Sequence, residues 1–245
     1  MQIGSYHFKA RLLPTLVLLL VLPLLVYLGL WQLDRYDIKR GMVQEQADNQ
    51  DKSVVEISTR AQIEGLGRGR QVSMTGEFDL QRSVLLINRK NAGRPGFEVF
   101  TPFMIDGGDS VLVNRGWVAD RTGQNFIPEL PGTAGKLRLT GLVDTPPSIG
   151  IKLGSPQVGD LGWPRKVLYM EMAWLGKELE LELPKYTVLQ VSPDEPAYTR
   201  NWEDHFNNPG GIPAERHMSY AIQWFALALA LLIIYVVVNT KKIKR

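Results

Sequence analysis

The stretch LLPTLVLLLVLPLLVYLGLWQL, from Leu12 to Leu33, decides the fold because it contains no charged residue and directly follows Arg11. A second uncharged stretch, HMSYAIQWFALALALLIIYVVVNT, runs from His217 to Thr240 and directly follows Arg216. At about 1.5 Å rise per residue, helices of these lengths span about 33–36 Å, enough to cross a hydrocarbon core of about 30 Å. The sequence therefore predicts two membrane-spanning helices with a single domain between them.

The charges are distributed unevenly along the chain. The two tails carry six lysines and arginines and no acid, whereas the remaining 22 basic residues lie with all 25 acidic residues in the segment 34–216. Short basic tails stay cytoplasmic, while long loops are translocated largely regardless of charge. We therefore expect a protein of the bacterial inner membrane with both termini inside. The predicted parts are a cytoplasmic tail (1–11), a transmembrane helix (12–33), a periplasmic domain (34–216), a second transmembrane helix (217–238) and a basic cytoplasmic tail (239–245).

Two other interpretations of these features are disfavoured. A cleaved signal peptide has an apolar core of about 7–15 residues and a small-x-small cleavage site, and neither is found in the first stretch. The net charge of +3 is located in the tails, so it indicates topology and gives no reason to expect a nucleic-acid partner.

Several classes of chemistry are excluded by residues that the sequence lacks. It has no cysteine, which removes disulfides, thiolate metal sites and covalent attachment of c-type haem. With only His7, His205 and His217, a closed zinc site is not expected. No Gly-x-Ser-x-Gly, His-Glu-x-x-His or phosphate-loop motif occurs. We therefore predict a protein that is not an enzyme.

The segment between the apolar stretches has the pattern of a β-rich domain. The first helix is expected to continue over Asp34–Asp48, a short helix is expected near Trp174–Glu180, and Thr145–Arg165 and Tyr198–Glu215 are expected as loops. The predicted fold class is a membrane protein of the α+β type, with two transmembrane helices flanking one antiparallel β-rich extracytoplasmic domain, either a barrel or a sandwich. Strands separated by Gly and Pro turn signals are predicted at Gln71–Glu77, Ser83–Asn88, Phe97–Ile105, Ser110–Val118, Lys136–Val143, Val167–Met172 and Tyr186–Val191.

Candidate functional residues gather where both apolar stretches meet the same membrane face. His217, Tyr220 and Trp224 are spaced i, i+3 and i+7, so they share one face of a helix, while Trp31 and Arg35 are i and i+4 on the other helix. Taken singly, interfacial Trp and Tyr are typical of an aromatic belt and a flanking Arg is typical of snorkelling. His217 is a candidate metal ligand, although a lone interfacial histidine is more often an incidental polar residue.

A second candidate site ends the predicted strand Val111–Val118. Asn114, Arg115, Gly116 and Trp117 place a charge, a flexible joint and a large ring at a strand end. Such a group suits a binding site, but the commoner alternative is a hairpin edge at which Arg115 pairs with an acid and Trp117 covers the core.

Four motifs in this order carry a family resemblance. They are GLWQLDR at 29–35, Pro95-Gly96-Phe97 followed by Thr101-Pro102, VNRGWV at 113–118, and HMSYAIQWF at 217–225. On these motifs, and on the two-span layout, nearly the whole chain resembles the Surfeit locus 1 family of cytochrome oxidase assembly factors.

The resemblance implies a role in the biogenesis of a haem-copper terminal oxidase, with haem a bound and then inserted into subunit I. Oxidase subunit I and haem a synthase are the implied partners. A lipid-facing cleft between two helices suits the apolar macrocycle and its isoprenoid tail, and an arginine at the interface suits the propionates. The implied iron ligand is His217, and the other implied haem-binding residues are Trp31, Gln32, Arg35, Tyr220 and Trp224.

Two alternatives remain open at this stage. In the first, the protein is a scaffold that holds an oxidase-subunit intermediate without touching haem, and the same aromatic and charged residues form a protein–protein face. In the second, it is an anchored periplasmic enzyme or ligand binder whose site lies inside the β-rich domain, so that the piece Asn49–Arg200 retains activity alone. The sequence leaves open which oxidase is served, and it also leaves open the oligomeric state.

Overall fold

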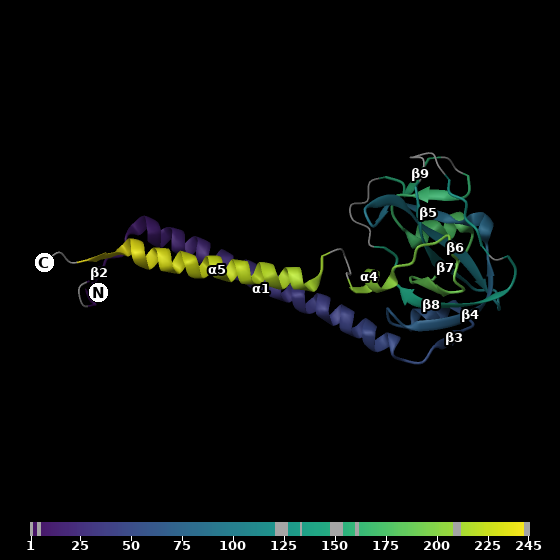
Figure 1. The fold of residues 1–245 in the computed structure, drawn as a ribbon, viewed down its shortest axis with the longest axis horizontal. Helices are drawn as coiled ribbons and strands as arrows, with labels where there is room; N and C mark the ends of the chain where they lie inside the picture. The colour runs from purple at the N-terminus through teal and green to yellow at the C-terminus, as the bar shows by residue number, and fades with distance from the viewer. Residues whose placement is uncertain are drawn as a thin grey trace. The chain divides into compact units, whose positions relative to one another are not determined.

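The computed structural model describes residues 2–3, 6–120, 127–132, 134–147, 154–159, 162–207 and 212–242. The chain divides into two compact units. The first, the helical unit, comprises residues 1–43 and 207–245, and the second, the β unit, comprises residues 44–206. Helix α1 (Leu12–Gln50) begins in the helical unit and ends in the β unit (Figure 1).

The helical unit pairs α1 with α5 (Ala214–Asn239) in antiparallel fashion (Figure 1). Both helices are long and apolar enough to cross a membrane, as expected of a membrane protein. Helix α1 starts at the predicted Leu12 and continues without a break to Gln50, which agrees with the predicted extension over Asp34–Asp48. Helix α5 begins at Ala214, earlier than predicted, directly after an extended Pro213.

Hydrogen bonds join the ends of the two helices that lie near the chain termini. The Thr15 and Tyr235 hydroxyl groups are 3.0 Å apart, and the Arg11 backbone N–H donates to the side-chain oxygen of Asn239 at 2.7 Å. Beyond the helices, β2 (Tyr6–Phe8) pairs with β12 (Thr240–Lys242) and with β1 (Gln2–Ile3). This small sheet, which the sequence pattern did not predict, fixes the two tails to each other.

The β unit contains a closed barrel, which confirms one of the two predicted architectures. Its strands are hydrogen-bonded in the ring order β4-β8-β11-β7-β6, and β6 pairs back onto β4. Followed round the ring in the other direction, β4-β6-β7-β11-β8, the strands are the first, second, third, fifth and fourth of the barrel in chain order. The third and fifth strands, β7 and β11, are parallel, and this is the connectivity of an OB-type barrel. The strands are β4 (Gln71–Phe78), β6 (Arg94–Ile105), β7 (Ser110–Ala119), β8 (Leu137–Asp144) and β11 (Thr187–Ser192).

Alternate residues of these strands fill one core. Val72, Met74, Phe103, Leu139 and Val188 are all fully buried and belong to one cluster. Because successive side chains on a strand point to opposite faces, this alternation places one apolar face of every barrel strand inside. The barrel is therefore a packed core rather than a channel.

Further strands and short helices surround the barrel. Strand β5 (Val84–Asn91) pairs with β6 and carries β10 (Arg165–Val167) and then β9 (Gln157–Val158) on its other side, while β3 (Val55–Ile57) pairs with β4. The helical segments of the unit are α2 (Arg60–Glu64), a 3₁₀ turn at Leu80–Arg82, α3 (Met172–Leu179) and α4 (Trp202–Asn207).

Some sequence predictions for the β unit were wrong. The predicted strand Val167–Met172 does not form, since β10 ends at Val167 and α3 starts at Met172. The sheet is not wholly antiparallel: β3–β4, β5–β10 and β7–β11 are parallel pairs. These strands are far apart in sequence and are joined by long connections, so no local turn signal marks them.

The two predicted loops contain short elements. Thr145–Arg165 includes β9 and the first residue of β10, and Tyr198–Glu215 includes α4 and the first turn of α5. Residues 148–153, 160–161 and 208–211 of these loops lie outside the described part of the chain.

Candidate functional site

The helical unit brings His217 of α5 against Gln32 of α1. The distance from His217 Nδ1 to Gln32 Oε1 is 2.7 Å. Half-buried and buried residues recur every three or four positions on both helices, and His217 and Gln32 belong to these two facing rows. His217 is only 9% exposed. A polar pair is thus built into an otherwise apolar seam between the helices.

The contact with Gln32 gives the two ring nitrogens of His217 different roles. With Gln32 Oε1 facing the ring, the amide oxygen can only accept, so this arrangement puts the hydrogen on Nδ1 and the lone pair of a neutral imidazole on Nε2. Nε2 has no hydrogen-bond partner in the described part of the chain. His217 therefore has one nitrogen held and one available as a ligand.

The other predicted residues of this site have no hydrogen bond to the pair in the described part of the chain. Trp31 is 42% exposed and Tyr220 is 45% exposed, on the flanks of α1 and α5, whereas Trp224 is half-buried. The Arg35 guanidinium lies 5.8 Å from the centre of the Trp31 ring, within range of a cation–π contact. The structure thus joins His217 to Gln32 and Arg35 to Trp31, and it leaves Tyr220 at an exposed edge.

A close approach that the sequence did not point to lies one helical turn from Gln32. A Cβ atom on Gly29 would meet ring atoms of Phe225 at 2.7 Å. Only glycine leaves room for that ring, so Gly29 sets how near α1 and α5 come at this level. The signal that could have indicated this contact is a glycine inside an apolar helix, where glycine is otherwise unfavourable.

The residues of the second predicted site, Asn114–Trp117, lie inside the β unit on β7. Arg115 is fully buried and donates to both carboxylate oxygens of Glu195, at 2.6 and 3.3 Å, and to the Pro131 carbonyl. Its guanidinium is 5.0 Å from the Phe78 ring centre and 4.5 Å from that of Tyr198. This is the geometry of a structural clamp around a buried cation.

Gly116 and Trp117 of β7 contact the segment around Thr199. Gly116 has a φ of +121°, and a Cβ atom there would meet the Thr199 carbonyl oxygen at 2.9 Å. Trp117 and Thr199 exchange two backbone hydrogen bonds of 2.8 Å. Because glycine alone combines this φ with this contact, the segment around Thr199 pairs closely with β7.

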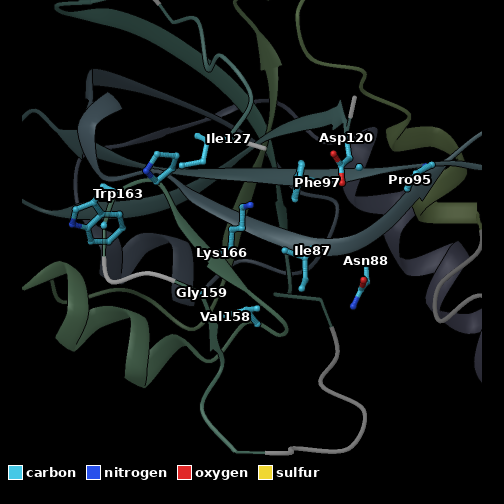
Figure 2. Close-up of a pocket in the computed structure, with 13 residues that line it drawn as sticks. Ile87, Asn88, Pro95, Phe97, Asp120, Ile127, Val158, Gly159, Trp163 and Lys166 are labelled. Carbon is cyan, nitrogen blue, oxygen red and sulfur yellow. The ribbon is translucent and has the colours of Figure 1, made fainter. Parts of the chain in front are cut away.

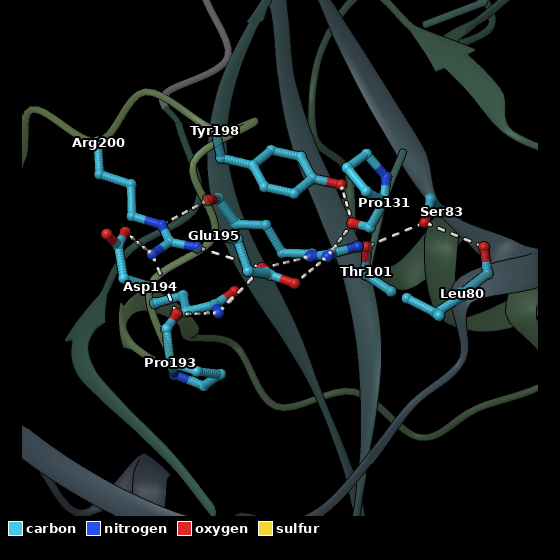
Figure 3. A network of polar contacts seen from close by, with 11 residues as sticks. Leu80, Ser83, Thr101, Pro131, Pro193, Asp194, Glu195, Tyr198 and Arg200 are labelled. Atoms are coloured by element: carbon cyan, nitrogen blue, oxygen red, sulfur yellow. Dashed lines mark hydrogen bonds and ion pairs between the residues drawn. The ribbon is translucent and has the colours of Figure 1, made fainter. Parts of the chain in front are cut away.

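Glu195 also binds Arg200, so one carboxylate serves two guanidinium groups. Arg200 Nη2 donates to Glu195 Oε2 at 3.2 Å (Figure 3). Burial raises the pKa of the Tyr198 phenol to about 12, against the opposing effect of Arg115. Burial likewise lowers the pKa of Arg200, although Glu195 opposes this shift.

The raised pKa of Tyr198 makes the unfolding free energy of the protein depend on pH. The unfolded phenol ionises near pH 10, below the folded one, so its contribution is complete below about pH 10 and is lost as the pH rises towards 12. Between about pH 9 and pH 11.5 we expect the wild type to lose about 2 kcal/mol more of its unfolding free energy than Tyr198→Phe does. Urea unfolding at both pH values measures this difference. Equal losses in the two proteins would mean that the phenol is not withdrawn from water.

A third polar cluster was missed because its residues come from distant segments. Asp144 is buried and accepts from Arg68 Nε, and its other oxygen is 2.7 Å from His205 Nε2. The Arg68 guanidinium also lies 5.0 Å from the Phe206 ring centre. Asp144 thereby holds His205 through Nε2.

The β unit also has a pocket of about 600 Å³, within the usual range for ligand sites (Figure 2). Ile87, Phe97 and Trp163 give it an apolar lining, and Asp120 and Lys166 give it two charges. None of its described lining residues is His, Met, Cys or Tyr, the usual axial ligands of haem iron. Nor does any group of three or more His, Cys, Asp or Glu suited to a metal ion occur in the described ranges.

These features define a class of protein in which a pair of apolar helices, bridged by a His–Gln contact, flanks a β-barrel unit. The sequence profile of the SURF1 family matches residues 19–229, and the chain belongs to this family. The members of this family are known generally as oxidase assembly factors.

Relatives of known name carry the same family designation. A SURF1-like protein of Rickettsia felis is 24% identical over 224 residues, covering 91% of this chain and 95% of the relative. One of Rickettsia bellii is 25% identical over 222 residues, covering 90% and 88%. One of Dictyostelium discoideum is 29% identical over 132 residues, covering 50% of this chain and 48% of the relative.

Proposed function

We propose that this chain is an inner-membrane assembly factor for a haem-copper terminal oxidase, and that it holds haem a as cargo for subunit I. Family membership supports the assembly role. The His217–Gln32 pair is the single observation that carries the haem proposal, because it supplies an imidazole with one nitrogen held and the other available. In this proposal α1 and α5 span the membrane, both basic tails are cytoplasmic and the β unit is periplasmic.

The residues around His217 fit such a cargo chemically. Neutral imidazole is a common axial ligand of haem iron. Trp31 of α1 and Tyr220 of α5 expose aromatic surface, and Arg35 places a cation where α1 leaves its apolar stretch. Aromatic rings stack on a macrocycle and a guanidinium pairs with propionates, so the iron, the macrocycle and the propionates each have a complementary group.

The other two histidines are poorer candidates. His205 lies in the polar cluster of Asp144 and Arg68 rather than between apolar helices, and His7 is exposed in the short terminal sheet, where it faces Lys241 across β2–β12. The pocket of the β unit, which is where the alternative of a periplasmic ligand binder would place its site, offers no usual haem ligand among its described lining residues. These contrasts favour His217 over any other described position.

The test is an optical spectrum of the detergent-purified protein after co-expression with haem a synthesis. We expect a haem a band in the wild type, its loss in His217→Ala, and its retention in the matched control His7→Ala. His217→Ala should still co-purify with oxidase subunit I, because in this proposal the binding of subunit I does not depend on the iron ligand. A folded wild-type protein that carries no haem when haem a is available would favour the scaffold alternative.

A further inference from the structure

We infer that Gln32 is a positioning residue, which holds His217 in the Nδ1–H tautomer and thereby presents Nε2 to the iron of the cargo. The identity of the cargo rests on the proposed function. The tautomer rests only on the contact between α1 and α5, so the two can fail separately.

The geometry leaves little freedom to the pair. Nδ1 and Oε1 are 2.7 Å apart, a short hydrogen bond for this type of donor and acceptor. His217 is nearly buried and Gln32 is half-buried, so few water molecules compete for either group. A glutamine amide that faced water would hydrogen-bond to water as readily as to a side chain, whereas between these two helices the amide of Gln32 has His217 as its partner.

The chemistry of the acceptor then matters for the ligand. Histidines that ligate metals usually donate their second N–H to a carbonyl or a carboxylate, which fixes the ring and raises its basicity. An amide oxygen is uncharged and draws the proton less strongly than a carboxylate does. Gln32 therefore orients the imidazole while keeping it a moderate donor, which suits a protein that must release what it binds.

One alternative arrangement makes a contrasting prediction. If the amide were reversed, its NH₂ group would donate to Nδ1, and the hydrogen of the neutral ring would lie on Nε2. His217 would then have no free lone pair, and Gln32 would block ligation instead of promoting it. The two arrangements differ in one proton, which nuclear magnetic resonance locates directly.

The first experiment uses the cargo-free protein in detergent, labelled with ¹⁵N-histidine. In the wild type we expect the His217 ring signals to show hydrogen on Nδ1. In Gln32→Met, which keeps the chain length and removes the acceptor, we expect the hydrogen to move largely to Nε2. Gln223→Met is the matched control, because Gln223 is exposed on α5, and it should leave His217 unchanged. A wild-type hydrogen on Nε2, or an unchanged tautomer in Gln32→Met, would overturn the inference.

The second experiment titrates the wild type, these variants and Gln32→Glu with haem a, and measures the reduction potential of the bound haem. We expect Gln32→Met to weaken haem binding by about 10–100-fold. Gln32→Glu should favour ferric over ferrous haem, and a tenfold change in that preference lowers the potential by about 59 mV. If the wild type binds no haem, the proposed function fails while the tautomer result stands. If it binds haem and Gln32→Met does so with equal affinity and potential, the positioning role of Gln32 is refuted.

Discussion

Arg115→Ala is expected to destabilise the β unit by about 3–5 kcal/mol, the cost of breaking a buried ion pair from one side. The variant leaves Glu195 without its two-oxygen partner and leaves the Phe78 and Tyr198 rings without the cation between them. Because whole domains are stable by about 5–15 kcal/mol, a large part of the stability would be lost. Urea unfolding of the full chain in detergent, followed by tryptophan fluorescence, measures the change.

Arg138→Ala is the matched control for this variant. Arg138 binds Glu56 at 2.6 Å, but its side chain is 67% exposed, and exposed pairs contribute about 0–1 kcal/mol. Arg115→Lys keeps the charge and loses the planar fork, so its loss should fall between those of Arg115→Ala and Arg138→Ala. A loss in Arg115→Ala no greater than that in Arg138→Ala would show that the buried network adds no stability.

The elements of the fold that the sequence predicted are those with a local signal. The two apolar helices follow from uncharged length, and the hairpin of β6 and β7 follows from apolar strands around Asp106-Gly107-Gly108-Asp109. Barrel closure by β4 and β6 has no such signal, because it depends on pairing between residues that are distant in sequence. The same holds for the parallel pair β7–β11, and for the three residues of β10 that pair with β5.

The candidate sites divide in the same way. The helical spacing of His217 and Trp224 was readable from sequence, but the partner of His217 was not, since Gln32 is 185 positions away. For Arg115 the commoner alternative predicted from sequence was pairing with an acid, but nothing singled out Glu195 among 25 acidic residues. Charge pairing in a folded core is set by topology, and spacing along the chain does not encode it.

Gly29→Val is expected to weaken haem a binding by roughly five- to a hundredfold, which corresponds to about 1–3 kcal/mol of overpacking. The added atoms would meet the Phe225 ring, and the helices would have to separate at that level. Gln32 lies about one turn further along α1, so separation lengthens its bond to Nδ1 of His217 and releases the ring. Haem titration and the ¹⁵N-histidine spectrum measure the two consequences on one sample.

Two further variants test whether the effect of Gly29→Val comes from the distance between the helices or from the loss of a glycine within α1. Gly41→Ala changes a glycine of the same helix that has no atom within 4 Å of the added Cβ, so it should alter neither readout. Gly29→Val combined with Phe225→Ala removes the opposing ring and should restore both the Nδ1–H tautomer and haem affinity. If Gly29→Val alone leaves the tautomer and the affinity intact, the contact between Gly29 and Phe225 does not control the His217–Gln32 pair, and the seam must be held by other contacts between α1 and α5.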